Sequence, residues 1–261
     1  MTGNSHSNKW FVFPRPNQAA AARLFCFHYA GGSAQVFHSW TGRLPSSLEV
    51  VAIQLPGRGH RIGEPHIRPL LRLSQIMAHE MLPYIDKPFA FFGHSLGALL
   101  CFETARSLRS GNWRQPDCLF VSATEAPHRR SPDKALAGLP KNELIKKLHE
   151  FDGTPMEVLE NEELLDLFLP TIRADFELNE TYEYHPEPPL DCPIAIYGGV
   201  ADRAVEPERL AAWKQMTTGS CETRMFTGGH FYINNPRLTF LQTLAADLLR
   251  LIPQSDQARY I

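Results

Sequence analysis

The sequence predicts an α/β protein with a mostly parallel central sheet, helices on both of its faces and an inserted helical segment. Short apolar runs alternate with longer amphipathic runs from residue 23 to residue 126. This alternation is typical of strand and helix units around a parallel sheet. The pattern breaks between residues 127 and 189, where the chain is charged and helical in composition, and it then resumes. We therefore expect one core, residues 1–126 and 190–261, with a helical insertion at 127–189.

The strands are predicted from continuous apolar runs, because parallel strands are buried on both faces. The predicted strands cover residues 23–29, 50–55, 89–93, 118–123, 193–197 and 222–226. The stretch WFVFPRP, residues 10–16, adds a short strand whose prolines suit only an edge or an exit.

The helices are predicted from apolar residues that recur at helical spacing. Residues 70–85 place Leu70, Leu73, Ile76, Met77 and Met81 near one face. Inside the insertion we expect helices over 142–150 and 162–184, the second interrupted at Pro170. Two more helices should follow, one from near Glu206 and one over 236–251.

Composition excludes several classes of function. Hydrophobic residues make up 43% of the 261 residues and charged residues 21%, and the formal net charge of −2 favours neither nucleic acid nor an anionic membrane as a partner. No apolar stretch approaches the ~20 residues of a membrane span, and the start MTGNSHSNKW lacks the features of a secretory signal. We expect a cytoplasmic protein. Its five scattered cysteines form no CxxC pair and predict free, buried thiols.

A serine between two glycines marks the end of the strand at 89–93. The run FFGHSLGALLCFE, residues 91–103, passes from this strand through Ser95 into an amphipathic segment. A strained strand-to-helix turn of this kind exposes the hydroxyl as a nucleophile, and small neighbours leave room for the bend. The helix that follows also directs its N–H groups toward the serine. Alone, the motif also fits an ordinary glycine-rich turn.

A serine nucleophile requires a histidine base and an acid that orients it. His230, in the loop FTGGHFY after the last strand, is the candidate base, because His149 and His185 fall in the insertion. Asp202 follows the strand at 193–197, at the end where ligand-facing groups of parallel sheets gather, whereas Asp191 precedes it. Taken singly, Asp202 also fits a turn or helix cap and His230 a loop residue. Both residues follow parallel strands at the edge of the sheet where Ser95 lies. With Ser95 they also occur in the chain order Ser, Asp, His, and both points favour a triad.

Two backbone amides are candidates for stabilising a negative oxygen. One is Leu96, directly after the serine. The other is Ala30, in the glycine-rich loop Ala30-Gly31-Gly32 that follows the strand at 23–29 and otherwise fits an ordinary turn. Packing at strand ends is the simpler role for His28 and His94, as helix capping is for Ser33.

Six segments together resemble the type II thioesterases, over roughly residues 20–250. They are FCFHYAGGSA (25–34), LPGRGHR (55–61), FFGHSLGALLCFE (91–103), LPTIRADFELNETYEY (169–184), YGGVADRAV (197–205) and GGHFYI (228–233). The resemblance implies an α/β-hydrolase fold and places the catalytic triad on Ser95, Asp202 and His230. It also places the oxyanion loop on Tyr29, Ala30 and Gly31.

The resemblance further implies that the chain hydrolyses acyl thioesters on the phosphopantetheine arm of carrier protein domains. Such domains belong to nonribosomal peptide and polyketide synthases. It implies no cofactor, no metal and no nucleic-acid or membrane partner, and we expect a monomer. The insertion would be a lid over the serine.

Within that lid, one apolar face could close over an acyl chain or simply dock on the core. It comprises Leu164, Leu167, Phe168, Ile172 and Phe176. We expect Arg173 and Asp175 to form a solvated charge pair.

Three other interpretations remain open. A carboxylesterase or lipase would use the same triad on small esters. A receptor that retained the fold would have the pocket without the chemistry. Acyl transfer to an alcohol or amine would differ only in the second nucleophile.

Overall fold

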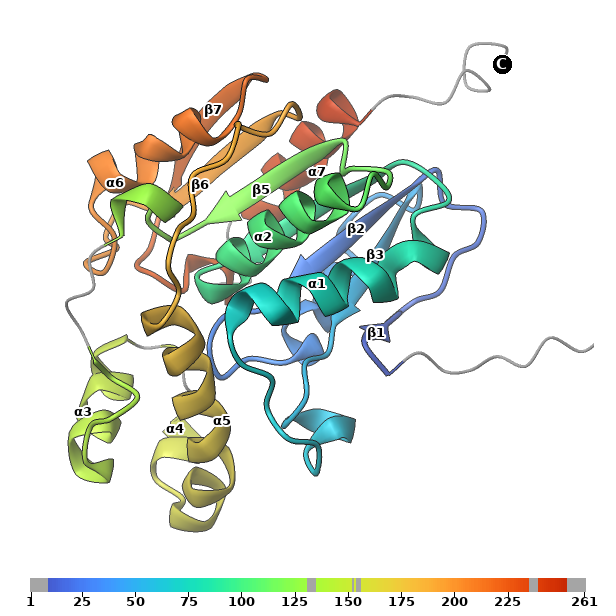
Figure 1. Ribbon diagram of the computed structural model, residues 1–261. Coiled ribbons are helices and arrows are strands. Elements are labelled where there is room, and N and C mark those ends of the chain that lie inside the picture. The colour runs from blue at the N-terminus through green and yellow to red at the C-terminus, as the bar shows by residue number, and fades with distance from the viewer. Residues whose placement is uncertain (1–8, 131–134, 152, 154–155, 235–238, 253–261) are drawn as a thin grey trace, which may run out of the picture.

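A seven-stranded sheet runs through the centre of the computed structural model, which describes residues 9–130, 135–151, 153, 156–234 and 239–252. The strands are Phe11–Val12 (β1), Ala22–Phe27 (β2), Leu48–Ile53 (β3), Phe89–His94 (β4), Cys118–Ser122 (β5), Ile194–Gly199 (β6) and Cys221–Phe226 (β7). Their order across the sheet is β1-β3-β2-β4-β5-β6-β7 (Figure 1). β1 pairs antiparallel with β3 at the edge, and the remaining pairs are parallel. The predicted fold class and edge strand are confirmed.

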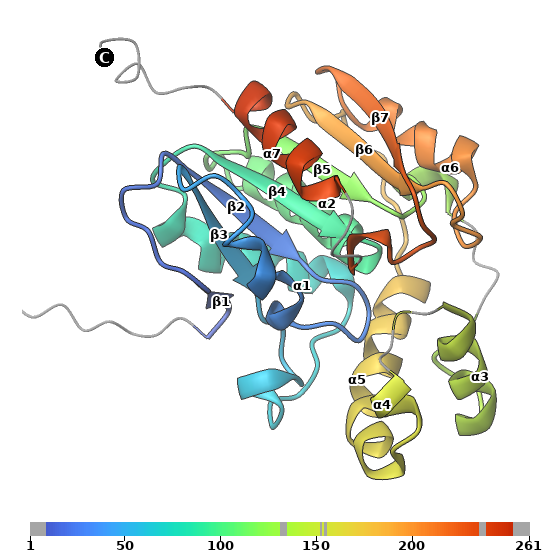
Figure 2. The same cartoon turned by 180° about the vertical axis from the view of Figure 1, so that it is seen from behind.

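Helices cover both faces of the sheet, as the buried strands require. Leu70–Met81 (α1), Leu96–Ser110 (α2) and Pro207–Ala211 (α6) pack on one face, and Phe240–Leu251 (α7) packs on the other (Figures 1 and 2). All six residues of β4 are buried between these layers. The strand that leads to Ser95 is therefore held from both sides.

In the described residues between β5 and β6, the chain forms three α-helices. They are Lys141–Phe151 (α3), Met156–Leu159 (α4) and Glu162–Glu180 (α5), and they lie beyond the end of the sheet toward which the β5 arrow points (Figure 1). They share a small apolar core of their own, formed by Leu144, Leu148, Leu159, Leu165, Leu169 and Ile172. We call them the inserted helices.

The predicted interruption at Pro170 is wrong, because α5 continues through it from Glu162 to Glu180. A proline inside a helix removes one backbone hydrogen bond and crowds the preceding turn. Here the helix is buried on both sides of the proline, at Leu165 and Leu169 before it and at Ile172 and Asp175 after it. Packing of this face outweighs the lost hydrogen bond.

The other predicted helices are present with shifted ends. α1 ends at Met81, and a 3-10 turn at Leu82–Tyr84 follows with Pro83 near its start. α7 begins at Phe240, while residues 235–238 of the predicted helix lie outside the described residues. Ser33 caps a 3-10 helix, Ala34–Trp40, as expected. The cysteines are all free, and burial is complete for Cys26, Cys101 and Cys118 and partial for Cys192 and Cys221.

Candidate active site

Ser95 occupies a strained turn between β4 and α2. Its backbone angles are φ 54° and ψ −119°, a region that side-chain-bearing residues rarely adopt. Gly93 and Gly97 make the turn possible, since a Cβ on Gly93 would lie 2.3 Å from the Gly97 carbonyl oxygen. The Ser95 N–H donates to the Ser122 carbonyl on β5 at 2.8 Å. The serine is thereby held at the rim of the sheet.

Two loops at the same rim bring Asp202 and His230 together. Gly199, at the end of β6, lies so close to the loop after β7 that a Cβ there would be 2.3 Å from the Gly229 carbonyl oxygen. The Ala201 N–H also donates to the Gly228 carbonyl at 2.9 Å. The two loops can approach this closely because glycines line both.

His230 and Asp202 are in direct contact. His230 Nδ1 lies 2.9 Å from Asp202 Oδ2, and the other carboxylate oxygen accepts the Ala204 N–H at 2.8 Å. The side chains are 14% and 4% exposed, respectively. A neutral imidazole that donates from Nδ1 keeps Nε2 free as a proton acceptor. Within the described residues no hydrogen bond joins Ser95 to His230, but both line one cavity.

Of the two candidate amide donors, Ala30 lines the cavity and Leu96 directly follows Ser95, which lines it. Leu96 is the first residue of α2, and the first-turn N–H groups of a helix have no partner within it. Ala30 lines the cavity, and among the described residues no group accepts a hydrogen bond from its N–H. The structure therefore brings together all five residues that the sequence pointed to: Ala30, Ser95, Leu96, Asp202 and His230.

A buried polar chain lies behind the histidine. His94 Nδ1 is 2.8 Å from Ser122 Oγ, which is 2.6 Å from the Tyr232 hydroxyl. The His94 ring lies edge-on to the His230 ring, with 5.3 Å between centroids. Burial, followed by the nearby His230, keeps the pKa of His94 well below its usual value. His94 thus stays uncharged and places no second positive charge beside His230.

The cavity has a volume of about 470 Å³, and the insertion supplies its apolar wall. Leu136, Leu148, Phe151 and Phe176 line it together with Phe231 from the loop that carries His230. Of the apolar face predicted on α5, Phe176 lines the cavity, and Leu164 and Leu167 are 37% and 50% exposed. The face is thus divided, with Phe176 at the cavity, Phe168 and Ile172 in the apolar core of the inserted helices, and Leu164 and Leu167 facing outward.

Comparison with known proteins identifies the family. A family model described as the thioesterase domain matches residues 22–248. The chain belongs to the thioesterase family. The thioesterase is 39% identical to the gramicidin S biosynthesis protein GrsT of Aneurinibacillus migulanus, over 95% of this chain and 97% of GrsT.

Solved structures agree with this assignment. The type II thioesterase BorB of the borrelidin biosynthetic cluster has a TM-score of 0.85 and 37% identity, covering 94% of this chain and all of BorB. ClbQ of the colibactin NRPS/PKS pathway has a TM-score of 0.83 and 28% identity, covering 89% of this chain and 98% of ClbQ. The thioesterase is thus an acyl-thioester hydrolase with the α/β-hydrolase fold.

One charge pair of the thioesterase differs from the sequence expectation. Arg173 does not pair with Asp175 but donates to the carbonyls of Ala137 and Leu139. Asp175 is fully buried and pairs with Arg58 instead. The expected solvated pair is therefore wrong. Helical periodicity could have placed Asp175 on the buried face with Ile172, but nothing local in the sequence identifies a partner so far away.

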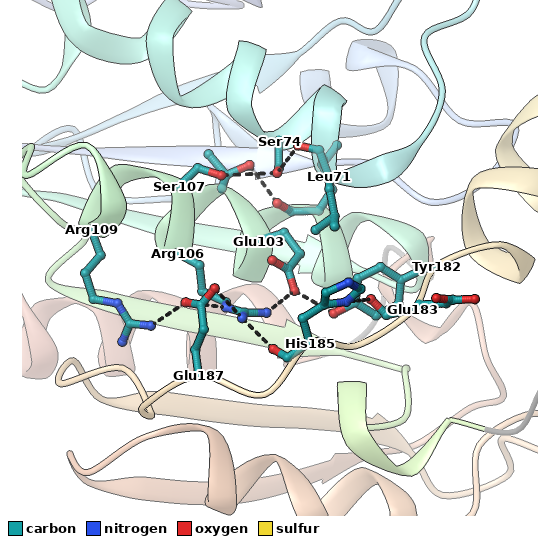
Figure 3. A network of polar contacts seen from close by, with 12 residues as sticks. Leu71, Ser74, Glu103, Arg106, Ser107, Arg109, Tyr182, Glu183, His185 and Glu187 are labelled. Carbon is teal, nitrogen blue, oxygen red and sulfur yellow. Dashed lines mark hydrogen bonds and ion pairs between the residues drawn. The ribbon is translucent and has the colours of Figure 1, made fainter.

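A second polar cluster ties α2 to the chain segment that follows the inserted helices (Figure 3). Tyr182 lines the cavity, and its hydroxyl donates to Glu103 on α2 at 2.5 Å. Arg106, one turn further along α2, pairs with Glu103 at 2.7 Å and also with Glu187. Burial raises the pKa of the Glu103 carboxyl. The helix that begins at Leu96 is fixed at its middle by this cluster.

The described part of the chain holds neither a metal-binding cluster nor a membrane-spanning helix. No three His, Cys, Asp or Glu side chains there lie close enough together to hold a metal ion. No helix within the same residues has the length and apolar character needed to cross a bilayer.

Proposed function

We propose that the thioesterase hydrolyses acyl thioesters carried on the phosphopantetheine arm of carrier domains, with Ser95 as the nucleophile. The contact between His230 and Asp202, at the cavity that Ser95 also lines, is the observation that carries this proposal. It is the arrangement that a neutral histidine needs in order to act as a base toward a serine hydroxyl.

In the first half of the reaction, Ser95 Oγ attacks the thioester carbonyl carbon while its proton passes to His230 Nε2. The carbonyl oxygen becomes negative and is stabilised by the N–H groups of Ala30 and Leu96. The carbon–sulfur bond then breaks, and the proton on His230 passes to the departing thiol. Asp202 holds the ring in the required tautomer and stabilises its charged form.

In the second half, water attacks the acyl-Ser95 ester and gives one proton to His230. The bond between the acyl carbon and Ser95 Oγ breaks, and His230 returns the proton to the serine. A carboxylic acid leaves, and the enzyme is restored.

The carrier-bound substrate is supported by the named relatives. GrsT and BorB are named for the biosynthesis of gramicidin S and borrelidin, and ClbQ for an NRPS/PKS pathway. Aromatic and aliphatic side chains of the insertion suit an acyl group, and an insertion beyond the rim of the sheet suits a lid. In this proposal residues 127–189 form that lid, and the core is residues 1–126 and 190–261.

The triad and the two amides supply all the chemistry, so the reaction needs no cofactor or metal; the phosphopantetheine belongs to the partner. We place the reaction in the cytoplasm, with the thioesterase acting as a monomer on an acyl or peptidyl carrier protein domain.

The decisive experiment follows acyl loss by intact-mass spectrometry. A panel of carrier domains loaded with different acyl groups is incubated with the wild type and with Ser95→Ala. We expect the wild type to return carriers to their free-thiol mass and the variant to be slower by about 10⁶-fold, the usual effect of removing a triad nucleophile. Full turnover by Ser95→Ala would refute the mechanism.

The same preparation tests the alternatives. A carboxylesterase would turn over p-nitrophenyl esters with a higher kcat/KM than acylated carriers. A receptor without chemistry would form no covalent adduct with a fluorophosphonate. Acyl transfer would appear as an ester or amide product when an alcohol or amine is added.

A further inference from the structure

The most completely buried charge pair of the site joins the insertion to the core. Arg58, in the loop after β3, and Asp175, on α5, are 4% and 1% exposed at their side chains. The guanidinium donates to both carboxylate oxygens, at 2.6 and 2.7 Å. A buried ion pair gives little net stability compared with apolar residues of the same shape, because both charges must leave water. Stability alone is therefore a weak explanation for it.

Both members of the pair also bind the loop that carries Ala30. Asp175 Oδ2 accepts the Gly31 N–H at 2.7 Å, and Arg58 Nη1 donates to the Gly32 carbonyl at 3.1 Å. Gly31 has a φ of +75°, which glycine adopts readily because it has no Cβ. With no side chain of its own to fix the backbone, this position depends on contacts from neighbouring groups. Two groups outside the triad and outside the loop thus contribute hydrogen bonds to the loop conformation.

Each peptide unit of this loop has a group held by a hydrogen bond. The Tyr29 carbonyl, which shares a plane with the Ala30 N–H, accepts from the Gly32 N–H and lies near His28 Nδ1, both at 2.9 Å. Because a peptide unit is planar and trans, fixing this carbonyl fixes the opposite direction of the Ala30 N–H. The next plane is fixed at the Gly31 N–H by Asp175, and the plane after Gly32 is fixed by Arg58.

We propose that Asp175 and Arg58 are positioning residues that hold the Ala30 amide in its direction toward the reacting oxygen. This rests on the proposed function. In this arrangement α5 has two roles. Its residues Phe176, Asn179 and Glu180 line the cavity, and Asp175 positions the loop that carries Ala30. Docking of the insertion and assembly of the catalytic geometry are one event.

The central variant is Asp175→Asn, which keeps the size of the side chain but removes its charge. We expect kcat for an acylated carrier to fall by about 10²-fold, the lower range for losing one oxyanion donor, with KM changed less than about threefold. The rate of covalent labelling of Ser95 by a fluorophosphonate should fall in parallel, because that reaction also develops charge on an oxygen near the amides.

The chain offers a matched control on the same helix. Thr171 is also buried on α5, and its hydroxyl donates to the Gly57 carbonyl at 2.6 Å, in the loop that carries Arg58. Thr171→Val therefore weakens the same docking contact without touching residues 30–32. We expect it to lower the melting temperature and to leave kcat within about threefold of the wild type. Equal losses of kcat in Thr171→Val and Asp175→Asn would overturn the proposal.

A double variant separates positioning from folding. Replacing both charges by apolar residues, Arg58→Met with Asp175→Leu, removes the uncompensated charge and should restore stability close to that of the wild type. We expect kcat to stay low, because the Gly31 N–H and the Gly32 carbonyl still lack their partners. Recovery of kcat together with stability would show a purely structural role. Failure of the wild type itself to release acyl groups, or full activity of Ser95→Ala, would instead refute the proposed function.

Discussion

The backbone of Gly97 lies directly against the carbonyl oxygen of Phe27, and a Cβ on Gly97 would come within 2.2 Å of that oxygen. The first turn of α2 thus rests on the end of β2. This contact brings the amide that follows Ser95 close to the loop that begins at His28. Two segments 70 residues apart in the chain share the candidate oxyanion site because one position lacks a side chain.

Gly97→Ala should therefore destabilise the thioesterase, although alanine is the better helix former. Since the obstacle is backbone, the clash cannot be relieved by a side-chain rotation, and we expect the free energy of unfolding to fall by about 3 kcal/mol, with a loss of activity. Urea denaturation measures it. Gly63→Ala is the control, because nothing lies within 4 Å of a Cβ there. Equal stabilities of the two variants would contradict the prediction.

Asp202→Asn should lower kcat by about 10⁴-fold while leaving the fold intact, as the same change does in a Ser-His-Asp protease. An amide can donate to His230 Nδ1 and so favours the wrong tautomer. Kinetics on an acylated carrier and a thermal melt measure the two effects. Asp191→Asn, at the opposite end of β6, should leave kcat unchanged; a comparable loss there would point to a general effect of charge.

Phe176→Ala should shift the acyl preference toward longer chains, because it enlarges the cavity on the insertion side. Each methylene newly accommodated contributes about 0.8 kcal/mol. For two more carbons, the ratio of kcat/KM for the longer over the shorter acyl chain should therefore be about tenfold higher in the variant than in the wild type. Leu167→Ala, on the exposed side of the same helix, should not change the preference. Competition between carriers of different acyl length gives the ratio directly.

The stability of the protein should fall as the pH drops from about 6.5 toward 4, in part because of His28. Burial and the charge of Arg58 lower the pKa of His28 to about 4. In the unfolded chain its pKa is about 6.5, so below that pH the unfolded state binds the additional proton and gains stability. The effect amounts to about 3 kcal/mol once the pH reaches 4.

His28→Asn tests this dependence, because asparagine does not titrate and its amide can still donate to the Tyr29 carbonyl. We expect the difference in unfolding free energy between wild type and variant to change with pH over this range. Parallel pH profiles for the two proteins would show that His28 is protonated alike in both states. Asp175 faces His28 as well and opposes the shift, so Asp175→Asn should steepen the dependence.

The sheet and the rim residues could be predicted from sequence because their signals are local. An apolar run such as residues 89–93 is sufficient to indicate a strand buried on both faces. Glycines at 93 and 97 indicate the turn around Ser95. The carboxyl ends of parallel strands share one edge, which places Asp202 and His230 near the serine without any knowledge of distances.

The environment of α5 could not be predicted in the same way. Pro170 carries a strong local signal for a break, but packing along the whole helix overrides it. Asp175 sits among charged residues in the sequence, yet its partners Arg58 and Gly31 are 117 and 144 positions away. Whether a carboxylate is solvated or buried depends on such distant partners, which only the folded chain reveals.

Because α5 is attached to the core at Thr171 and Asp175, the two sides of the cavity differ in how they are connected to the core. The wall on α5 is hydrogen-bonded to the loops that follow β2 and β3. Leu148 and Phe151 on α3 form another wall, and α3 packs against α5. Substitutions in α3 can therefore reshape the space for the acyl group without moving the reacting atoms. Such an arrangement lets substrate range diverge between related enzymes while bond cleavage is kept unchanged.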